Sequence, residues 1–106
     1  MDRIATYVAW LVTHPGDRFA LYSLALELER AGDVEQAEAR LRELLTAHPL
    51  SGPGHYRLGQ LLLAAGRTDD ARAAWQLGAT ALAGATDAEA RRSAAEIARE
   101  LDLLDD

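Results

Sequence analysis

A chain of 106 residues is long enough to form a single domain with its own hydrophobic core. It contains no cysteine, which excludes disulfides and thiolate metal sites and fits a reducing, cytoplasmic location. The net charge is −6 and no lysine- or arginine-rich run occurs, which argues against nucleic acid and anionic membranes as partners, since both bind mainly through phosphates.

The first predicted helix covers residues 3–13. Its apolar stripe consists of Ile4, Tyr7, Val8 and Leu11. The segment lacks the basic leader of a signal peptide and the roughly 20 apolar residues of a membrane span. We therefore expect an ordinary packed helix in a cytoplasmic protein.

From residue 14 onward the sequence repeats itself with a shift of 34 residues. The shift pairs His14 with His48, Pro15 with Pro49, Tyr22 with Tyr56, Leu24 with Leu58, Leu28 with Leu62, Gly32 with Gly66 and Ala37 with Ala71. Two further pairs keep their size class: Ala25 falls on Gly59, so small stays small, and Leu41 falls on Trp75, so large stays large.

Each repeat unit is predicted to form two helices, near residues 18–31 and 35–47 and again near 53–65 and 69–83. Gly32 and Gly66 are typical helix stops, because glycine adopts the left-handed conformation that follows many helices. Asp33 with Gln36 resembles a capping box. At the equivalent start in the second unit we expect Thr68 or its neighbour to cap.

A last helix is predicted near residues 87–103. Thr86 and Glu89 have the spacing of a capping box. One apolar seam follows, formed by Ala90, Ala94, Ile97, Leu101 and Leu104. We expect this seam to shield the second hairpin.

The second unit resembles the tetratricopeptide repeat pattern W-x2-L-G-x2-Y…A-x3-F…P. Its matching residues are His55, Leu58, Gly59, Leu62, Ala71 and Trp75, and the first unit supplies Leu21, Leu24, Ala25, Leu28, Ala37, Leu41 and Pro49. No tryptophan opens either unit, and Ala83 stands where the pattern has proline.

This resemblance implies an all-α fold, an α-α superhelix of about six antiparallel helices in one domain over residues 1–106. The expected parts are a capping helix in 1–16, repeats in 17–50 and 51–84, and a second capping helix in 85–106. Small residues should lie where helices approach most closely, so that Gly59 faces Ala71, Ala25 faces Ala37, and Gly78 admits the next helix.

The resemblance further implies that the first helices of the two hairpins line a concave groove for a peptide or partner helix. The residues expected there, here called the groove residues, are Phe19, Tyr22, Leu26, Glu29, Arg30, Tyr56, Arg57, Gln60 and Leu63. We therefore predict a non-catalytic protein–protein interaction module. Tyr22, Leu26 and Tyr56 do not match the lysines and asparagines of the subclass that holds C-terminal carboxylates.

Two alternatives stay open for this surface. The flanking helices could fold over it, which would make its tyrosines ordinary core residues. The protein could instead be a structural component that associates with a second copy of itself, so a homo-oligomer is possible.

A third hypothesis, a metal-dependent or hydrolytic enzyme, has little support. Of the three histidines, His14 and His48 lie at equivalent helix ends and His55 takes the position of a packing aromatic. None has a second histidine at the i, i+4 spacing of a helical metal site. We expect no catalytic residue, no metal site and no cofactor.

Overall fold

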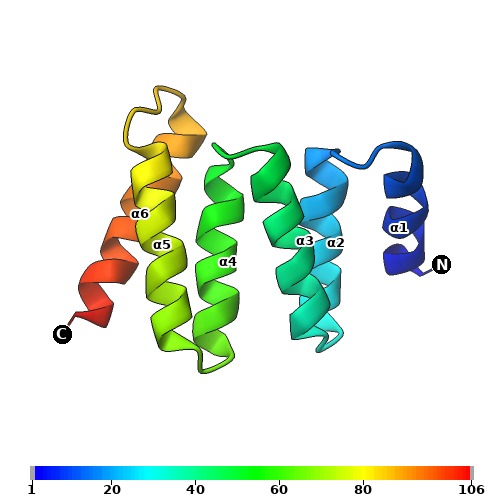
Figure 1. Cartoon of the computed structure of the whole chain (residues 1–106), viewed down its shortest axis with the longest axis horizontal. Coiled ribbons are helices and arrows are strands. Elements are labelled where there is room, and N and C mark those ends of the chain that lie inside the picture. Colours follow the sequence, from blue (N-terminus) through cyan, green and yellow to red (C-terminus); the bar gives the residue numbers. More distant parts are fainter. Residues whose placement is uncertain (1, 106) are drawn as a thin grey trace. The chain divides into compact units, whose positions relative to one another are not determined.

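The computed structural model describes residues 2–105, and within that range the chain forms six α-helices and no strand (Figure 1). The helices are α1 (Arg3–Thr13), α2 (Arg18–Arg30), α3 (Val34–Ala47), α4 (Gly52–Ala64), α5 (Thr68–Leu82) and α6 (Ala88–Leu104). Every bound lies within one residue of the predicted one. The all-α helical-repeat fold class is confirmed.

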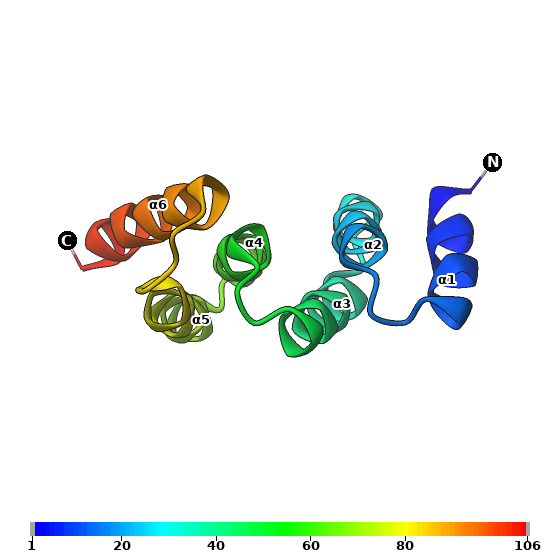
Figure 2. The ribbon, with the colours of Figure 1, turned by 90° about the horizontal axis from the view of Figure 1, so that it is seen from above.

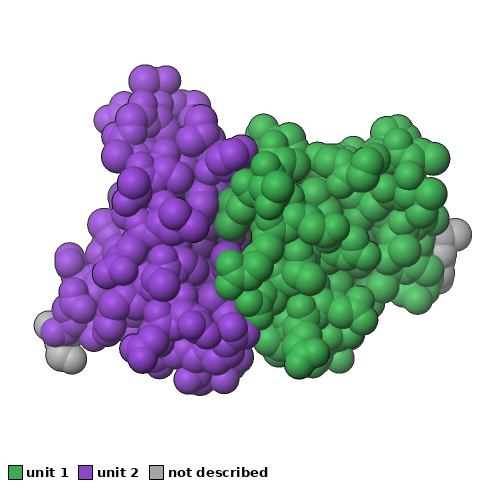
Figure 3. Space-filling model, viewed as in Figure 1, with its two compact units in different colours: residues 1–48 green, residues 49–106 purple. Residues whose placement is uncertain are grey.

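The helices group into two compact units, residues 1–48 and residues 49–106 (Figure 3). The first unit contains α1, α2 and α3, and the second contains α4, α5 and α6. The border between the units lies two residues before the one expected between the repeats.

In the first unit, α2 and α3 form an antiparallel hairpin and α1 packs against α2 (Figure 1, Figure 2). The core of this unit is leucine-rich, with Leu11, Leu21, Leu24, Leu28, Leu41 and Leu44 all buried. Within α2 and within α3 these leucines recur at spacings of three or four residues, which places them on one face of each helix.

Both hairpins turn through the same glycine geometry. Gly32 has a φ of 84° and Gly66 a φ of 80°, the left-handed region in which only glycine is unstrained. After α2, the Asp33 amide donates to the Leu28 carbonyl at 2.9 Å, and the Gly32 amide donates to the Glu29 carbonyl at 3.0 Å. These paired bonds satisfy carbonyls that the end of a helix leaves without partners.

Two of the predicted capping residues are wrong, although the helices begin within one residue of the expected positions. At α5 the N-cap is Arg67, without a side-chain capping bond, and Thr68 is already the first helical residue. At α6 the cap is Asp87, whose carboxylate accepts the Ala90 amide at 3.1 Å, and not Thr86. A carboxylate one residue further along reaches the third helical amide in the same way that Asp33 does in α3.

The second unit is organised around the fully buried side chain of Trp75 on α5. A Cβ atom placed on Gly59 of α4 would collide with the Trp75 indole ring. The indole N–H donates to the Tyr56 carbonyl at 3.1 Å, which fixes the ring across α4. The atoms nearest to this position belong to Trp75 and not to Ala71, which was expected to face Gly59, so the missing side chain makes room for a large aromatic ring.

Gly78 has the role expected of it, at a place where three helices meet. A Cβ atom there would lie 2.8 Å from His55 Cβ of α4 and 3.2 Å from Ile97 Cδ1 of α6. Ile97 and Ala90 of α6 are buried in one cluster with Trp75 and Leu82. The predicted seam of α6 thus packs against the second hairpin, as expected.

Replacing Gly59 with alanine gives a test in which two effects have opposite signs. Helix propensity alone would stabilise the protein by about 1 kcal/mol. Overlap with a buried, hydrogen-bonded indole should dominate, and we expect a net loss of about 1 kcal/mol or more in the free energy of unfolding, measured by urea denaturation.

Gly84→Ala is the matched control, because no atom lies within 4 Å of the Cβ it would add. Its free energy of unfolding should stay within about 0.5 kcal/mol of the parent value. A Gly59→Ala protein as stable as this control would contradict the role assigned to Trp75.

Candidate functional site

The groove residues of the first unit lie along one side of α2. Phe19 at the start of this helix is 71% exposed, and Arg30 at its end is exposed as well. Tyr22, Leu26 and Glu29 between them are half-buried. Their spacing of three and four residues places aromatic, aliphatic and charged groups on a common helix face.

The groove residues of the second unit lie on α4 and are all half-buried. Tyr56 and Leu63 pack against the cluster around Trp75, and the ring centroids of Tyr56 and Trp75 are 6.5 Å apart. Gln60 Nε2 donates to the Tyr56 hydroxyl at 2.9 Å, and Arg57 Nη1 donates to Gln60 Oε1 at 3.4 Å. The α4 side chains therefore form a connected polar row above an apolar core.

Helix α6 accounts for much of this burial, because it packs against both α4 and α5. Burial raises the pKa of the Tyr56 hydroxyl above 10.0, and the nearby carboxylates of Glu100 and Glu96 on α6 raise it further. Nearby negative charge disfavours a phenolate. Tyr56 thus belongs in part to the core, as the covered-surface alternative describes for this helix.

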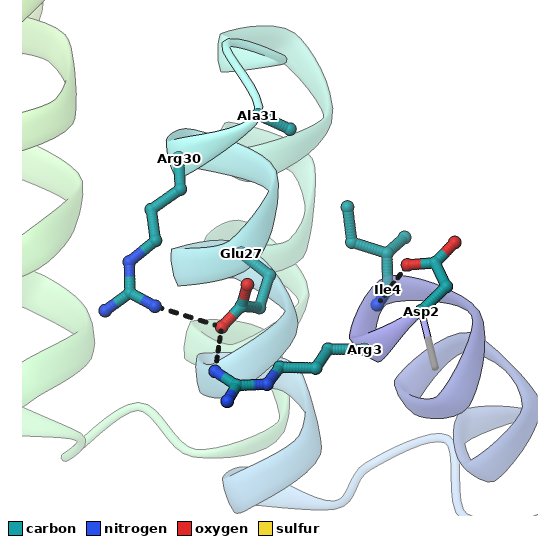
Figure 4. A pocket seen from close by; sticks show the side chains of 6 residues that line it. All are labelled: Asp2, Arg3, Ile4, Glu27, Arg30 and Ala31. Carbon is teal, nitrogen blue, oxygen red and sulfur yellow. Dashed lines mark hydrogen bonds and ion pairs between the residues drawn. The ribbon is translucent and has the colours of Figure 1, made fainter.

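Arg30 takes part in an ion-pair group that the sequence did not predict (Figure 4). The Glu27 carboxylate accepts from Arg30 Nη1 at 3.1 Å and from Arg3 Nη1 of α1 at 3.3 Å. Both arginine side chains are about 70% exposed, so each pair contributes at most about 1 kcal/mol. The i, i+3 spacing of Glu27 and Arg30 is visible in the sequence, whereas the contact with Arg3 depends on tertiary structure.

A pocket lies between α1 and the start of α2, and we call it the aromatic pocket. Its lining residues are Thr6, Tyr7, Trp10, Asp17, Phe19 and Ala20. Of these, sequence analysis identified only Phe19 as a site residue. In the sequence Tyr7 belongs to the apolar stripe of the first helix, but nothing there indicates that the aromatic side chains of α1 meet α2.

Asp17 is the charged residue of the aromatic pocket. Its carboxylate accepts the Ala20 amide at 3.0 Å as the N-cap of α2, and the Trp10 indole N–H at 2.9 Å. These two hydrogen bonds, the first more than the second, lower the pKa of Asp17 below its ordinary 3.8. The side chain is therefore ionised at neutral pH.

The three histidines serve structural contacts. His14 stacks on Trp10, with ring centroids 3.8 Å apart, and His48 Nε2 donates to the Gly16 carbonyl at 2.7 Å. His55 is 3% exposed, and its Nε2 donates to the Pro49 carbonyl at 2.8 Å. Among residues 2–105, no group of three or more His, Cys, Asp or Glu side chains could hold a metal ion.

No helix among residues 2–105 is long and apolar enough to cross a bilayer.

The raised pKa of Tyr56 predicts that, when phenolate absorbance is followed in the ultraviolet as the pH rises, one tyrosine ionises in a late step, at higher pH than an ordinary tyrosine. Because the folded pKa exceeds the unfolded one, stability should be complete below about pH 10 and should fall as the pH rises through the folded pKa. We expect Tyr56→Phe to remove the late step and to reduce this alkaline loss of stability. Tyr22→Phe should retain the late step. If the late step disappears in Tyr22→Phe instead, the assignment to Tyr56 is wrong.

Comparison with known proteins places these helices in a family. The fold is similar to the crystal structure of the Sgt2 TPR domain from Aspergillus fumigatus, with a TM-score of 0.68 and 19% identity over 96% of this chain and 68% of that one. A search of curated proteins found no match. The tetratricopeptide repeat family matches residues 22–88, which include both hairpins except the first four residues of α2. Its repeats generally form non-catalytic scaffolds for protein–protein interaction. The chain belongs to the tetratricopeptide repeat family.

Proposed function

We propose that this protein binds a peptide or a partner helix through the groove residues and has no catalytic activity of its own. The observation that carries the proposal is the exposed aromatic side chain of Phe19, 71% accessible on a helix that is otherwise well packed. An aromatic residue fixed on a rigid helix loses little conformational entropy when it binds, and such residues often anchor interfaces.

The face of α2 is the stronger part of this surface. Phe19, Tyr22 and Leu26 lie at successive helical positions and combine apolar area with the charges of Glu29 and Arg30. On α4, in contrast, Tyr56 and Leu63 pack against the Trp75 cluster, so less of their apolar surface is available. We propose that α2 provides most of the binding energy and that α4 contributes mainly polar contacts.

Self-association is the competing proposal, since an exposed apolar face could equally contact a second copy. Sedimentation over a range of protein concentrations separates the two. A monomer that captures a different protein supports the interaction module, whereas a dimer that captures nothing supports the structural role. We also propose a cytoplasmic location, with which the cysteine-free sequence is compatible.

Truncation on α2 should weaken capture of the partner from the native cell. We expect Tyr22→Ala and Leu26→Ala each to lower the affinity for the captured protein by about 2 kcal/mol, because residues at the centre of an interface dominate its energy. The control is Leu77→Ala on α5, an exposed apolar residue outside the groove residues. Equal loss in this control would contradict the assignment to α2.

The same substitution on α4 should act on the fold instead. We expect Tyr56→Ala to lower the free energy of unfolding by about 2–3 kcal/mol, because it removes the ring that packs on Trp75. Thermal melts beside Phe19→Ala provide the comparison, since Phe19 is mostly exposed and its loss should cost less than about 0.5 kcal/mol. A Tyr56→Ala protein as stable as Phe19→Ala would show that Tyr56 is a free surface residue.

A further inference from the structure

The aromatic pocket combines three aromatic rings with one carboxylate. Tyr7 and Phe19 meet edge to face, with centroids 6.3 Å apart and planes inclined by 72°. Trp10 is 48% exposed and is held in place by its hydrogen bond to Asp17. Trp10 and Phe19 are thus accessible, although His14 stacks on one face of Trp10, and Tyr7 is half-buried. The positions of the rings are fixed by contacts within α1 and at the start of α2.

The pocket is negatively charged. Asp17 is the only carboxylate among its lining residues, and neighbouring Arg18 is not one of them. Asp17 Oδ1 accepts the Ala20 amide and Oδ2 accepts the Trp10 indole N–H, and the Phe19 amide adds a further backbone hydrogen bond to the carboxylate. A carboxylate oxygen can accept two, so acceptor capacity remains for a ligand.

These properties select among ligand classes. An anionic side chain would be repelled by Asp17, and a purely aliphatic one would desolvate the carboxylate without offering a hydrogen bond, which is unfavourable. A cation satisfies both parts of the pocket, because it pairs with the carboxylate and is attracted to the faces of aromatic rings. Arginine suits this arrangement better than lysine, since its planar guanidinium can stack on a ring and donate hydrogen bonds at its edge.

We propose that the aromatic pocket binds an arginine side chain of a partner peptide, held by the Asp17 carboxylate and by the rings of Tyr7, Trp10 and Phe19. The inference rests on the proposed function and specifies the chemistry of the partner. The overall charge of −6 favours the approach of a basic segment. Phe19 connects the pocket to the rest of the α2 face, so one peptide can occupy both.

Nuclear magnetic resonance of the tryptophan indole N–H groups tests the proposal at the site itself. The chain has two tryptophans, and fully buried Trp75 serves as an internal reference for exposed Trp10. The probes are the peptides acetyl-ALRLA-amide, acetyl-ALQLA-amide and acetyl-ALELA-amide. We expect the arginine peptide to shift the Trp10 indole signal saturably, the glutamine peptide to bind at least about fivefold more weakly, and the glutamate peptide to leave the signal unchanged.

Asp17→Asn removes the charge and can still cap α2 through its one side-chain oxygen, but its amide nitrogen cannot accept from the Trp10 indole N–H. The peptide-free variant therefore serves as its own reference in the titration. We expect Asp17→Asn to weaken binding of the arginine peptide by about fivefold, and Phe19→Ala to weaken it by about threefold. Asp33→Asn makes the same change at the N-cap of α3, outside the pocket, and should bind like the parent. Circular dichroism confirms that each variant stays folded.

Three results would overturn the proposal. The first is equal affinity for the arginine and glutamine peptides, and the second is equal behaviour of Asp17→Asn and Asp33→Asn. The third is a Trp10 indole signal that no peptide moves at millimolar concentration. If a peptide shifts the signals of Tyr22 and Leu26 but not that of Trp10, the proposal for the aromatic pocket is wrong, whereas the proposed interaction module is supported. The two proposals can therefore fail separately.

Discussion

The second unit depends on one contact, in which the Trp75 ring occupies the space left by the missing side chain of Gly59. The ring is completely buried, and its N–H is bonded to the Tyr56 carbonyl on the opposite helix. This hydrogen bond satisfies the one polar atom of the indole, so the side chain contributes its full apolar surface without a desolvation penalty. The position of α5 against α4 follows from it, and Ile97 of α6 completes the same cluster.

The first unit solves the same packing problem with different residue sizes. At the positions 34 residues earlier, Ala25 stands for Gly59 and Leu41 stands for Trp75, and both are buried. From the second unit to the first, the glycine becomes a larger alanine while the tryptophan becomes a smaller leucine. The two changes in side-chain volume therefore partly offset each other. Interiors are packed densely enough that a change at one of two such positions requires a change at the other.

Features that depend on neighbours along the chain were predictable from the sequence. Helix bounds followed from apolar periodicity, and the ends of α2 and α4 followed from Gly32 and Gly66. Features that depend on distant residues were not: the sequence indicates a small residue at 59 but not that Trp75 fills the space. The aromatic pocket escaped prediction for the same reason, since Tyr7 and Trp10 meet Phe19 only through the packing of α1 on α2. Even a local choice failed where two residues competed, as when Asp87 and not Thr86 capped α6.

The two units distribute their aromatic residues differently, and we propose that this distribution separates stability from binding. In the second unit Tyr56 and Trp75 pack together, and α6 adds Ile97 to the same core. In the first unit Trp10 and Phe19 are 48% and 71% exposed, although burying such rings would each stabilise the fold by about 2 kcal/mol. Their rings are nevertheless held in place, by the indole bond to Asp17 and by the edge contact with Tyr7. Exposed aromatic surface that is kept in a fixed position contributes little to the free protein but lowers the entropic cost of binding a partner, which is why we assign recognition chiefly to α1 and α2.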